Sequence, residues 1–270
     1  MTDGRRSAPV GVFDSGIGGL TVVRSLMQHL PNERLIYFGD TARVPYGPKS
    51  PGTVRRYARQ IADWLIEQGV KAIVVACNTA TAHALDSLVA TVNVPVIGVV
   101  QPGARAAVSQ SRSRIIGVIG TAGTIASGAY ERAIHSLAPD AIVHALACPL
   151  FVPLVEEGWT DHAVTRLVAH EYLAPLGKYS VDSLVLGCTH YPLIADVIRD
   201  EVGTDVTLID SAEETARETG RVLQAMQLAA SHLAPGPHRF VASDAPDRFL
   251  ALGRRFLGES IGDIESVTFT

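Results

Sequence analysis

The chain has 270 residues, of which 47% are hydrophobic and 19% are charged. This length exceeds that of a usual single-core domain and predicts two α/β lobes or one large one. A formal net charge of −4, without a long basic run, argues against a nucleic-acid surface built on phosphate contacts. No apolar run approaches the roughly 20 residues of a membrane span. Small-molecule chemistry fits this composition better.

Cysteine usage suggests the compartment. The chain has three cysteines, an odd number, and its first six residues lack the apolar stretch of a secretory signal. We therefore expect a cytoplasmic protein with reduced thiols and no structural disulfide, without membrane or nucleic-acid partners.

Short β-branched runs alternate with amphipathic segments along the whole chain, which is typical of parallel sheets with helices on their faces. The expected strands are residues 9–13, 34–39, 71–76, 94–99, 114–119, 140–146, 182–187, 205–209, 238–242 and 264–269. The fold class is therefore predicted to be α/β with mainly parallel sheets.

Three of the connecting segments carry further signals. Apolar residues recur at helical spacing between 53 and 68, which predicts a helix with one buried face. The segment from Ser211 to Glu214 resembles a capping box that opens a long helix toward Met226. Residues 230–237 contain two prolines and a glycine and are expected to form a loop.

A weak internal repeat divides the chain into two halves. The segment VGVFDSG at 10–16 parallels IGVIGTA at 116–122, and a cysteine follows each at a similar offset. We expect two lobes related by a pseudo-twofold axis, the first formed by residues 1–99 with 211–270 and the second by 100–210. Ligands of open α/β sheets bind at the carboxyl ends of strands, so the active site is expected in the cleft between the lobes.

Cys77 and Cys188 each end an apolar run and begin a polar one, in AIVVACNT and SLVLGCTH. A single buried cysteine at a strand end is usually a small hydrophobe, and this interpretation is kept for Cys148. Two cysteines in matched positions, each at an expected helix start that favours a thiolate, indicate a pair of acid/base groups. Such a pair suits the inversion of a carbon centre, because one thiol takes a proton from one face and the other returns one to the opposite face.

The segment DSGIGGLT, which begins at Asp14, follows an expected strand and opens a helix. A dinucleotide-binding interpretation fails, because the third glycine of that fingerprint falls at Thr21 and Asp14 would repel a pyrophosphate. We expect instead that backbone N–H groups of this turn cradle a carboxylate, with Asp14 placed for an ammonium group or a proton. A turn that needs glycine only for its backbone angles is the alternative, and it leaves Asp14 unexplained.

Other polar side chains remain open to two interpretations. The segment from Tyr46 to Pro48 is either a plain turn or one that brings a backbone N–H and a phenol to an anionic ligand. His190, two residues after Cys188, is placed to orient or tune that thiol. Either Glu156 or its neighbour Glu157 is a candidate to polarise His190.

Two cofactor interpretations were weighed against these residues. Cys77, Cys188 and His190 form an accepted zinc ligand set, but the chain lacks a supporting CxxC or HxxxH pairing, and no metal is expected. Pyridoxal phosphate requires a Schiff-base lysine, and the chain's three lysines lie outside any convincing site. A route without cofactors is therefore favoured.

Taken together, the motifs closely resemble those of the glutamate racemase family, within the aspartate/glutamate racemase superfamily. The motifs are DSG at 14–16, GDTARVPYG at 39–47, ACNTA at 76–80 and GCTHYP at 187–192, and the resemblance extends from Pro9 to the last expected strand. It implies cofactor-independent interconversion of L- and D-glutamate, supplying D-glutamate for peptidoglycan, in two α/β lobes and commonly as a homodimer.

The resemblance also implies roles for individual residues. The acid/base thiols are Cys77 and Cys188, and Asp14 and His190 are expected to adjust them. The substrate-binding positions are Asp14, Ser15, Tyr46, Gly47, Asn78, Thr79, Thr189 and His190, while Asp40 and Glu156 match supporting acidic positions. The internal repeat adds Thr121, the counterpart of Ser15. Two other functions stay open: a related enzyme acting on aspartate or another acid, and a non-catalytic binding protein on the same lobes.

Overall fold

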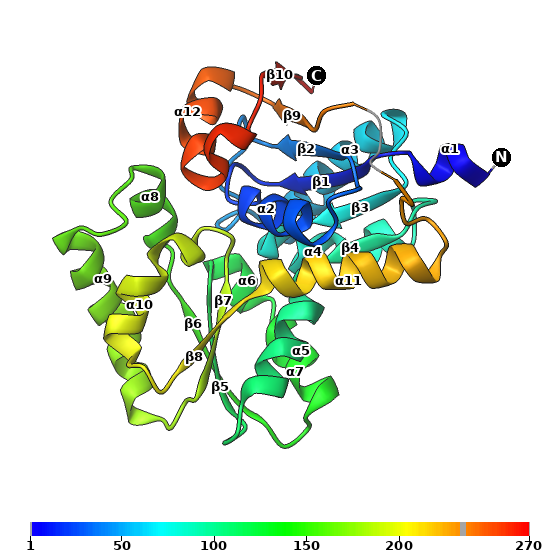
Figure 1. The fold of residues 1–270 in the computed structure, drawn as a ribbon. Helices are drawn as coiled ribbons and strands as arrows, with labels where there is room; N and C mark the ends of the chain where they lie inside the picture. Colours follow the sequence, from blue (N-terminus) through cyan, green and yellow to red (C-terminus); the bar gives the residue numbers. More distant parts are fainter. Residues whose placement is uncertain (1, 233–235, 270) are drawn as a thin grey trace.

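The computed structural model describes residues 2–232 and 236–269, and it contains two separate parallel sheets (Figure 1). The six-stranded sheet has the order β10-β9-β2-β1-β3-β4, and the four-stranded sheet has the order β6-β5-β7-β8. The first comprises β1 (Val10–Asp14), β2 (Leu35–Gly39), β3 (Ala72–Val75), β4 (Val96–Gly98), β9 (Arg239–Ala242) and β10 (Ile264–Ser266). The second comprises β5 (Ile115–Gly120), β6 (Ile142–Ala147), β7 (Ser183–Gly187) and β8 (Thr207–Asp210). The predicted fold class is confirmed.

Every strand predicted from the sequence is present. The largest difference is at β10, which ends at Ser266 and pairs with β9 alone at the edge of its sheet. The central strands β1 and β2 are buried along their whole length. Strands covered on both faces can be apolar at every position, which is why their sequences are continuous hydrophobic runs.

Helices cover both faces of the six-stranded sheet, which we call the first lobe together with them. Val10 and Val12 of β1 point to the layer of α2 (Leu20–His29), α11 (Ser211–Ala225) and α12 (Pro246–Leu257). Phe13 points to the opposite layer, formed by α3 (Pro51–Glu67) and α4 (Asn78–Val89). The alternation along β1 therefore builds two separate apolar cores, one on each face of the sheet.

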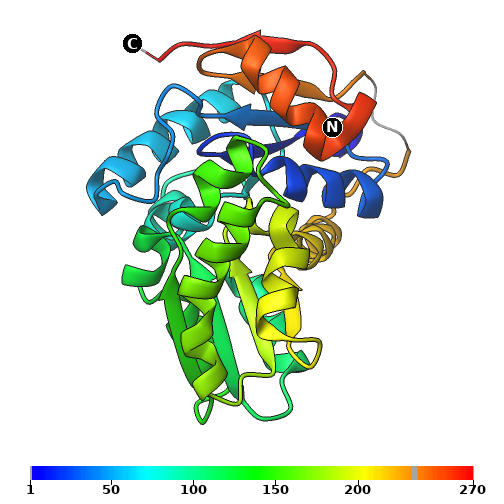
Figure 2. The ribbon, with the colours of Figure 1, turned by 90° about the vertical axis from the view of Figure 1, so that its left-hand side faces the viewer.

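The four-stranded sheet is covered in the same way, and with its helices forms what we call the second lobe. One face packs on α5 (Val100–Gln110) and α7 (Ala129–Leu137). The other packs on α8 (Phe151–Glu156), α9 (Ala163–Leu173), α10 (Ala195–Val202) and the short helices η1 (Ala174–Lys178) and η2 (Tyr191–Ile194). The remaining short helices are α1 (Thr2–Arg6), α6 (Ala122–Ala126) and η3 (Gly258–Ser260). The lobes stack with α11 at their junction (Figures 1 and 2).

Two helix starts differ from the sequence prediction. The capping box at Ser211 is wrong, because the N-cap of α11 is Asp210, whose carboxylate accepts a hydrogen bond of 2.8 Å from the Ala212 N–H. Asp210 is the last residue of β8, and its carboxylate takes the N-cap position that the sequence prediction had given to Ser211. Helix α3 begins at Pro51, two residues earlier than predicted, with Ser50 as its N-cap. Of the predicted loop at 230–237, residues 233–235 lie outside the described residues, and the others form no helix or strand.

The internal repeat corresponds to a repeated topology. Strands β2-β1-β3-β4 and β6-β5-β7-β8 occur in the same order, each with its first strand in the centre. Cys77 follows β3 and Cys188 follows β7, which occupy equivalent places in the two orders. Strands β9 and β10, from the C-terminal part of the chain, extend the first sheet beyond β2. In the described part of the chain, no helix is both long and apolar enough to cross a membrane.

Candidate functional site

A small cavity lies between the lobes, where the carboxyl ends of β3 and β7 meet. It is lined by Ser15, Val44, Pro45, Tyr46, Gly47, Cys77, Asn78, Thr79, Thr121, Val152, Cys188, Thr189 and His190. Ten of these thirteen residues are among those predicted from the sequence, and both thiols are included. The cavity volume is about 20 Å³, which is close to the space that one water molecule needs. The site is therefore closed in this structure.

The thiol of Cys77 lies at the start of α4. Its Sγ accepts a hydrogen bond of 3.4 Å from the Ala80 N–H and lies 3.7 Å from the Ser15 hydroxyl. Burial and the charge of Asp14 raise the pKa of the Cys77 thiol well above its usual value. The electrostatic surroundings of Cys77 therefore favour the protonated thiol, although the helix start alone would favour a thiolate.

The surroundings of Cys188 have the opposite charge. Its Sγ lies 3.8 Å from Nδ1 of His190, whose Nε2 is 3.2 Å from a carboxylate oxygen of Glu156. Burial lowers the pKa of His190, but the interactions with Cys188 and Glu156 outweigh burial and raise the pKa to about 10. His190 is thus an imidazolium at neutral pH and stabilises negative charge on Cys188. Of the two acids considered from the sequence, Glu156 makes this contact, whereas Glu157 faces Arg248.

The N–H groups of the turn after β1 face the Asp14 carboxylate in this structure, and the predicted cradle for a ligand carboxylate stays a prediction. The Gly16 N–H donates to Asp14 itself at 3.2 Å, and the Ser15 and Gly19 N–H groups also face this carboxylate. Asp14 is 1% exposed, and burial raises its pKa. A ligand carboxylate would therefore have to compete with Asp14, the side chain that begins the turn, for these N–H groups.

Glycine is required at Gly18 for a contact between the lobes. A Cβ there would lie 2.3 Å from Thr189 Oγ1 and 2.5 Å from His190 Nδ1. Any larger residue would push this turn away from the segment that follows Cys188. The Thr21 hydroxyl adds a hydrogen bond of 3.4 Å to the Thr189 carbonyl.

Tyr46 and Asp40 form a buried cluster behind the cavity. The Tyr46 hydroxyl donates to Asp40, which also accepts from Arg43 Nε at 2.8 Å and from the Ser243 hydroxyl at 2.9 Å. Burial and the charge of Asp40 raise the pKa of Tyr46, so its phenol stays protonated. Because the phenol is engaged with Asp40, the sequence-based option that it binds an anionic ligand is not supported in this structure.

Hydroxyl groups join the lobes at the other side of the cavity. Thr79 Oγ1 of the first lobe lies 2.8 Å from Thr121 Oγ1 and 3.1 Å from Thr124 Oγ1 of the second. The Gly123 N–H donates to the Gly47 carbonyl at 3.0 Å. Thr79, Gly47 and Thr121 thus lie together. The motifs had singled out Thr79 and Gly47, the internal repeat had singled out Thr121, and Thr124 was missed.

Other residues at the site were not predicted from the sequence. Val152 lines the cavity from α8, and Tyr130 of α7 donates a hydrogen bond of 2.7 Å to the Asn78 side-chain oxygen. Neither residue lies in one of the four motifs or next to Cys77 or Cys188 in the sequence. Tyr130 lies 52 residues from Asn78, so no local signal could have revealed the contact.

The described side chains around the cavity do not form a metal site. Among the described residues, no group of three or more His, Cys, Asp and Glu side chains is arranged to hold a metal ion. Cys77, Cys188 and His190 are therefore not arranged as a zinc ligand set in this geometry. All three cysteines are buried, and none forms a disulfide bond.

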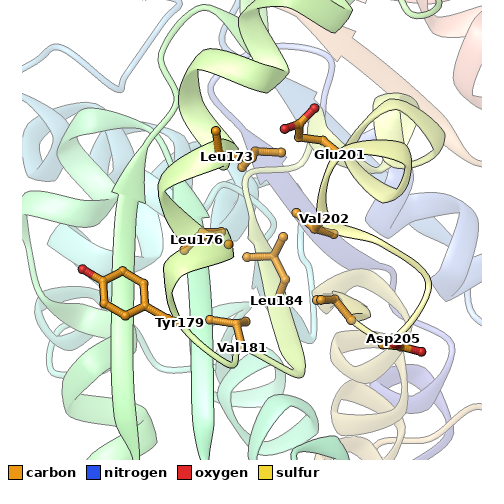
Figure 3. Close-up of a pocket in the computed structure, with 11 residues that line it drawn as sticks. Leu173, Leu176, Tyr179, Val181, Leu184, Glu201, Val202 and Asp205 are labelled. Carbon is orange, nitrogen blue, oxygen red and sulfur yellow. The ribbon is translucent and has the colours of Figure 1, made fainter.

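A larger cavity, of about 460 Å³, lies in the second lobe, away from the thiols (Figure 3). Its floor is apolar, with Leu173, Leu176 and Leu184, and Glu201 and Asp205 lie at its margin. It contains no cysteine or histidine. The larger cavity is therefore not the one that contains the two thiols.

The fold and the site define a class: a two-lobed α/β protein whose halves each supply one thiol to a shared, closed cavity. The chain belongs to the Asp/Glu/Hydantoin racemase family, whose model matches residues 18–219. It is 52% identical over 259 residues to the glutamate racemase of Geobacter metallireducens, covering 96% of each chain.

Solved structures show the same relationship. The glutamate racemase of Bacillus anthracis superposes with a TM-score of 0.92 at 42% identity, covering 97% of both chains. The glutamate racemase of Francisella tularensis in complex with D-glutamate has a TM-score of 0.91 at 41% identity, covering 97% of this chain and 98% of that one.

Proposed function

We propose that this protein interconverts L- and D-glutamate without a cofactor. One observation carries the proposal: Cys77 and Cys188 follow equivalent strands of the two lobes and line the same cavity. The similarity to glutamate racemases along nearly the whole chain supports glutamate as the substrate. Aspartate or another acid is the second candidate substrate, and the outcome of the experiment below decides between them.

The proposed reaction needs one thiolate and one thiol. The thiolate removes the α-proton of glutamate, and the thiol on the opposite face donates its proton to the resulting carbanion. The assignment is exchanged for the opposite enantiomer. Before substrate binds, the imidazolium of His190 lies 3.8 Å from Cys188 Sγ, whereas burial and the charge of Asp14 keep Cys77 protonated.

The weak acidity of the α-carbon is the main barrier to this reaction. Donors that bind the α-carboxylate more strongly as enolate character develops lower that barrier. Asn78 and the hydroxyls of Thr79, Thr121 and Thr189 line the cavity and are the proposed donors, with Ser15 beside Cys77. Asp40 supports the cavity wall through Tyr46.

Substrate entry requires the lobes to separate. The closed cavity of about 20 Å³ is far below the roughly 300 Å³ at which small-molecule sites begin. The contacts that close it are few and polar, such as Thr79 to Thr121 and Gly123 to Gly47. We propose that these contacts break when glutamate enters and re-form around it, which excludes water from the carbanion.

We further propose the domain division, partner and place of action expected from the family resemblance. Residues 1–99 and 211–270 would form one lobe and residues 100–210 the other, supported by the strand pairing of β9 and β10. The protein would act as a cytoplasmic homodimer that supplies D-glutamate for peptidoglycan. Sedimentation equilibrium tests the dimer, and a monomer mass at all concentrations would contradict it.

The first experiment is incubation of the pure protein with L-glutamate in deuterated water without added cofactor. Optical rotation and α-deuterium are followed together, the latter by NMR. Loss of rotation with deuterium uptake is expected. Deuterium uptake without inversion would mean that one thiol works alone, and exchange of aspartate but not glutamate would reassign the substrate. Absence of exchange with any amino acid would favour a binding protein.

A further inference from the structure

A hydrogen bond from Tyr130 fixes the orientation of the Asn78 side chain. Asn78 follows Cys77, is 3% exposed and lines the cavity. Its side-chain oxygen accepts the 2.7 Å hydrogen bond from Tyr130, and its Nδ2 is buried without a hydrogen-bond partner among the described residues. A buried amide donor left unpaired costs free energy, so a group that accepts from it binds favourably.

Tyr130 belongs to the second lobe, whereas Asn78 belongs to the first. The phenol is 2% exposed and is held tightly, since a Cβ on Gly187 would lie 3.1 Å from its ring. A Cβ on Gly103 of α5 would lie 3.2 Å from its oxygen. Tyr130 thus packs directly beneath the strand end that carries Cys188.

The protonation state of Tyr130 determines which group donates in its hydrogen bond with Asn78. Burial raises the pKa of Tyr130, and a hydrogen bond from Ser211 offsets part of that increase. The phenol is therefore protonated, and its hydroxyl donates to the Asn78 side-chain oxygen. An amide oxygen can only accept, so this contact fixes the amide with its NH₂ group on the other side.

We propose that Tyr130 is a positioning residue that orients the Asn78 amide so that Nδ2 donates to a carboxylate of the substrate. Because the hydrogen bond joins the two lobes, this donor is oriented only when the lobes are closed. The inference rests on the proposed racemisation of glutamate and adds a residue that acts through Asn78 without touching the substrate.

A double-mutant cycle on the full chain tests the proposal. Y130F removes one hydroxyl, and we expect kcat/KM for both enantiomers of glutamate to fall about tenfold, which equals about 1.4 kcal/mol and lies near the upper limit for one neutral hydrogen bond. In an N78A background the same change should lower kcat/KM by less than about twofold, since nothing remains to be oriented. Equal effects of Y130F in both backgrounds, or no effect in the wild type, would overturn the proposal.

Two further variants separate positioning from general damage. Y172F removes a tyrosine hydroxyl of the same lobe, which accepts a 3.4 Å hydrogen bond from the Leu150 N–H, and should leave kcat/KM unchanged. N78D keeps an acceptor for Tyr130 but loses the donor, so it should lose at least as much activity as N78A. An active N78D would refute the donor role even if Y130F failed to fold. A wild type that does not racemise glutamate would instead refute the proposed function itself, and this inference with it.

Discussion

The two thiols differ most clearly in the charged groups beside them. Cys77 has the buried carboxylate of Asp14 in its vicinity, and Cys188 has the His190 imidazolium at 3.8 Å. The two equivalent thiols therefore have unequal electrostatic surroundings, and for Cys77 burial and the Asp14 charge raise the pKa, which favours its role as a proton donor. A site with two identical environments would need substrate binding to create that difference.

Removal of either thiol should stop the reaction. We expect C77A and C188A each to lower racemisation of both enantiomers by at least about 10²–10⁴-fold, the usual contribution of a general acid or base. The measurement is polarimetry from each enantiomer, with circular dichroism to verify folding. C148A is the matched control, because Cys148 is buried in the second-lobe core and lies outside the cavity lining. Full turnover by C77A or C188A would refute the two-thiol scheme.

His190 predicts how stability depends on pH. Its pKa in the folded state is raised to about 10, whereas an unfolded histidine titrates near 6.5. A raised pKa stabilises the fold fully below about pH 6.5, and this contribution is lost as pH rises toward 10. Unfolding by urea at several pH values should therefore show the wild type losing stability relative to H190Q across this range. A constant difference between the two proteins would show that His190 does not titrate as inferred.

Much of the site was predictable where the chemistry lies next to a cysteine in sequence. Asn78, Thr79, Thr189 and His190 follow the thiols directly and line the same cavity. The carboxylate cradle at the first turn stays a prediction, and the motif could not show that the N–H groups of this turn face Asp14 in this structure. Tyr130 could not be predicted, since only the packing of the two lobes brings it to Asn78.

At the level of elements, a buried ion pair connects segments far apart in the sequence. Lys71 Nζ, before β3, lies 2.5 Å from a carboxylate oxygen of Glu33, before β2, and both side chains are at most 4% exposed. Glu33 also accepts from the Ala230 N–H at 2.8 Å, and Lys71 donates to the Arg6 carbonyl. The pair therefore fixes the amino-terminal ends of the central strands, opposite the cavity.

Breaking this pair should destabilise the fold without altering the chemistry. We expect K71M to lower the free energy of unfolding by about 3–5 kcal/mol, because it leaves the Glu33 carboxylate buried without its counter-charge. Urea denaturation measures the loss, and kcat at a temperature below the transition should stay near that of the wild type. The double variant K71M/E33L should recover much of the stability. A double variant as unstable as K71M would argue against an uncompensated charge as the cause.

The positions of the strands along the chain were easier to predict than the order in which they pair. Continuous apolar runs marked the central strands β1, β2, β3 and β7, which are buried along their whole length because both faces of each are covered. That β9 and β10 continue the first sheet beyond β2 depends on the return of the chain through α11, and no strand carries that information in its own residues. The cap of α11 was misplaced by one residue because both Asp210 and Ser211 are good N-cap residues.

For the whole molecule, the arrangement of side chains predicts insensitivity to metal removal. Cys77, Cys188 and His190 are not arranged as a metal ligand set. We therefore expect dialysis against EDTA to leave the racemisation rate of the complete enzyme within about twofold, whereas loss of a catalytic metal typically costs orders of magnitude. Activity that is lost on dialysis and restored by zinc would support the metal alternative. Dialysis against buffer alone is the control.

The unequal charges beside the two thiols cannot change the thermodynamics of the reaction, although the two lobes have matched strand orders. L- and D-glutamate have the same free energy in water, so the equilibrium constant of their interconversion is one. The ratio kcat/KM must therefore be identical in both directions, however different Asp14 and His190 make the two halves. The asymmetry of the site can show only in how this common ratio is divided: the enantiomer with the lower KM must also have the lower kcat, by the same factor.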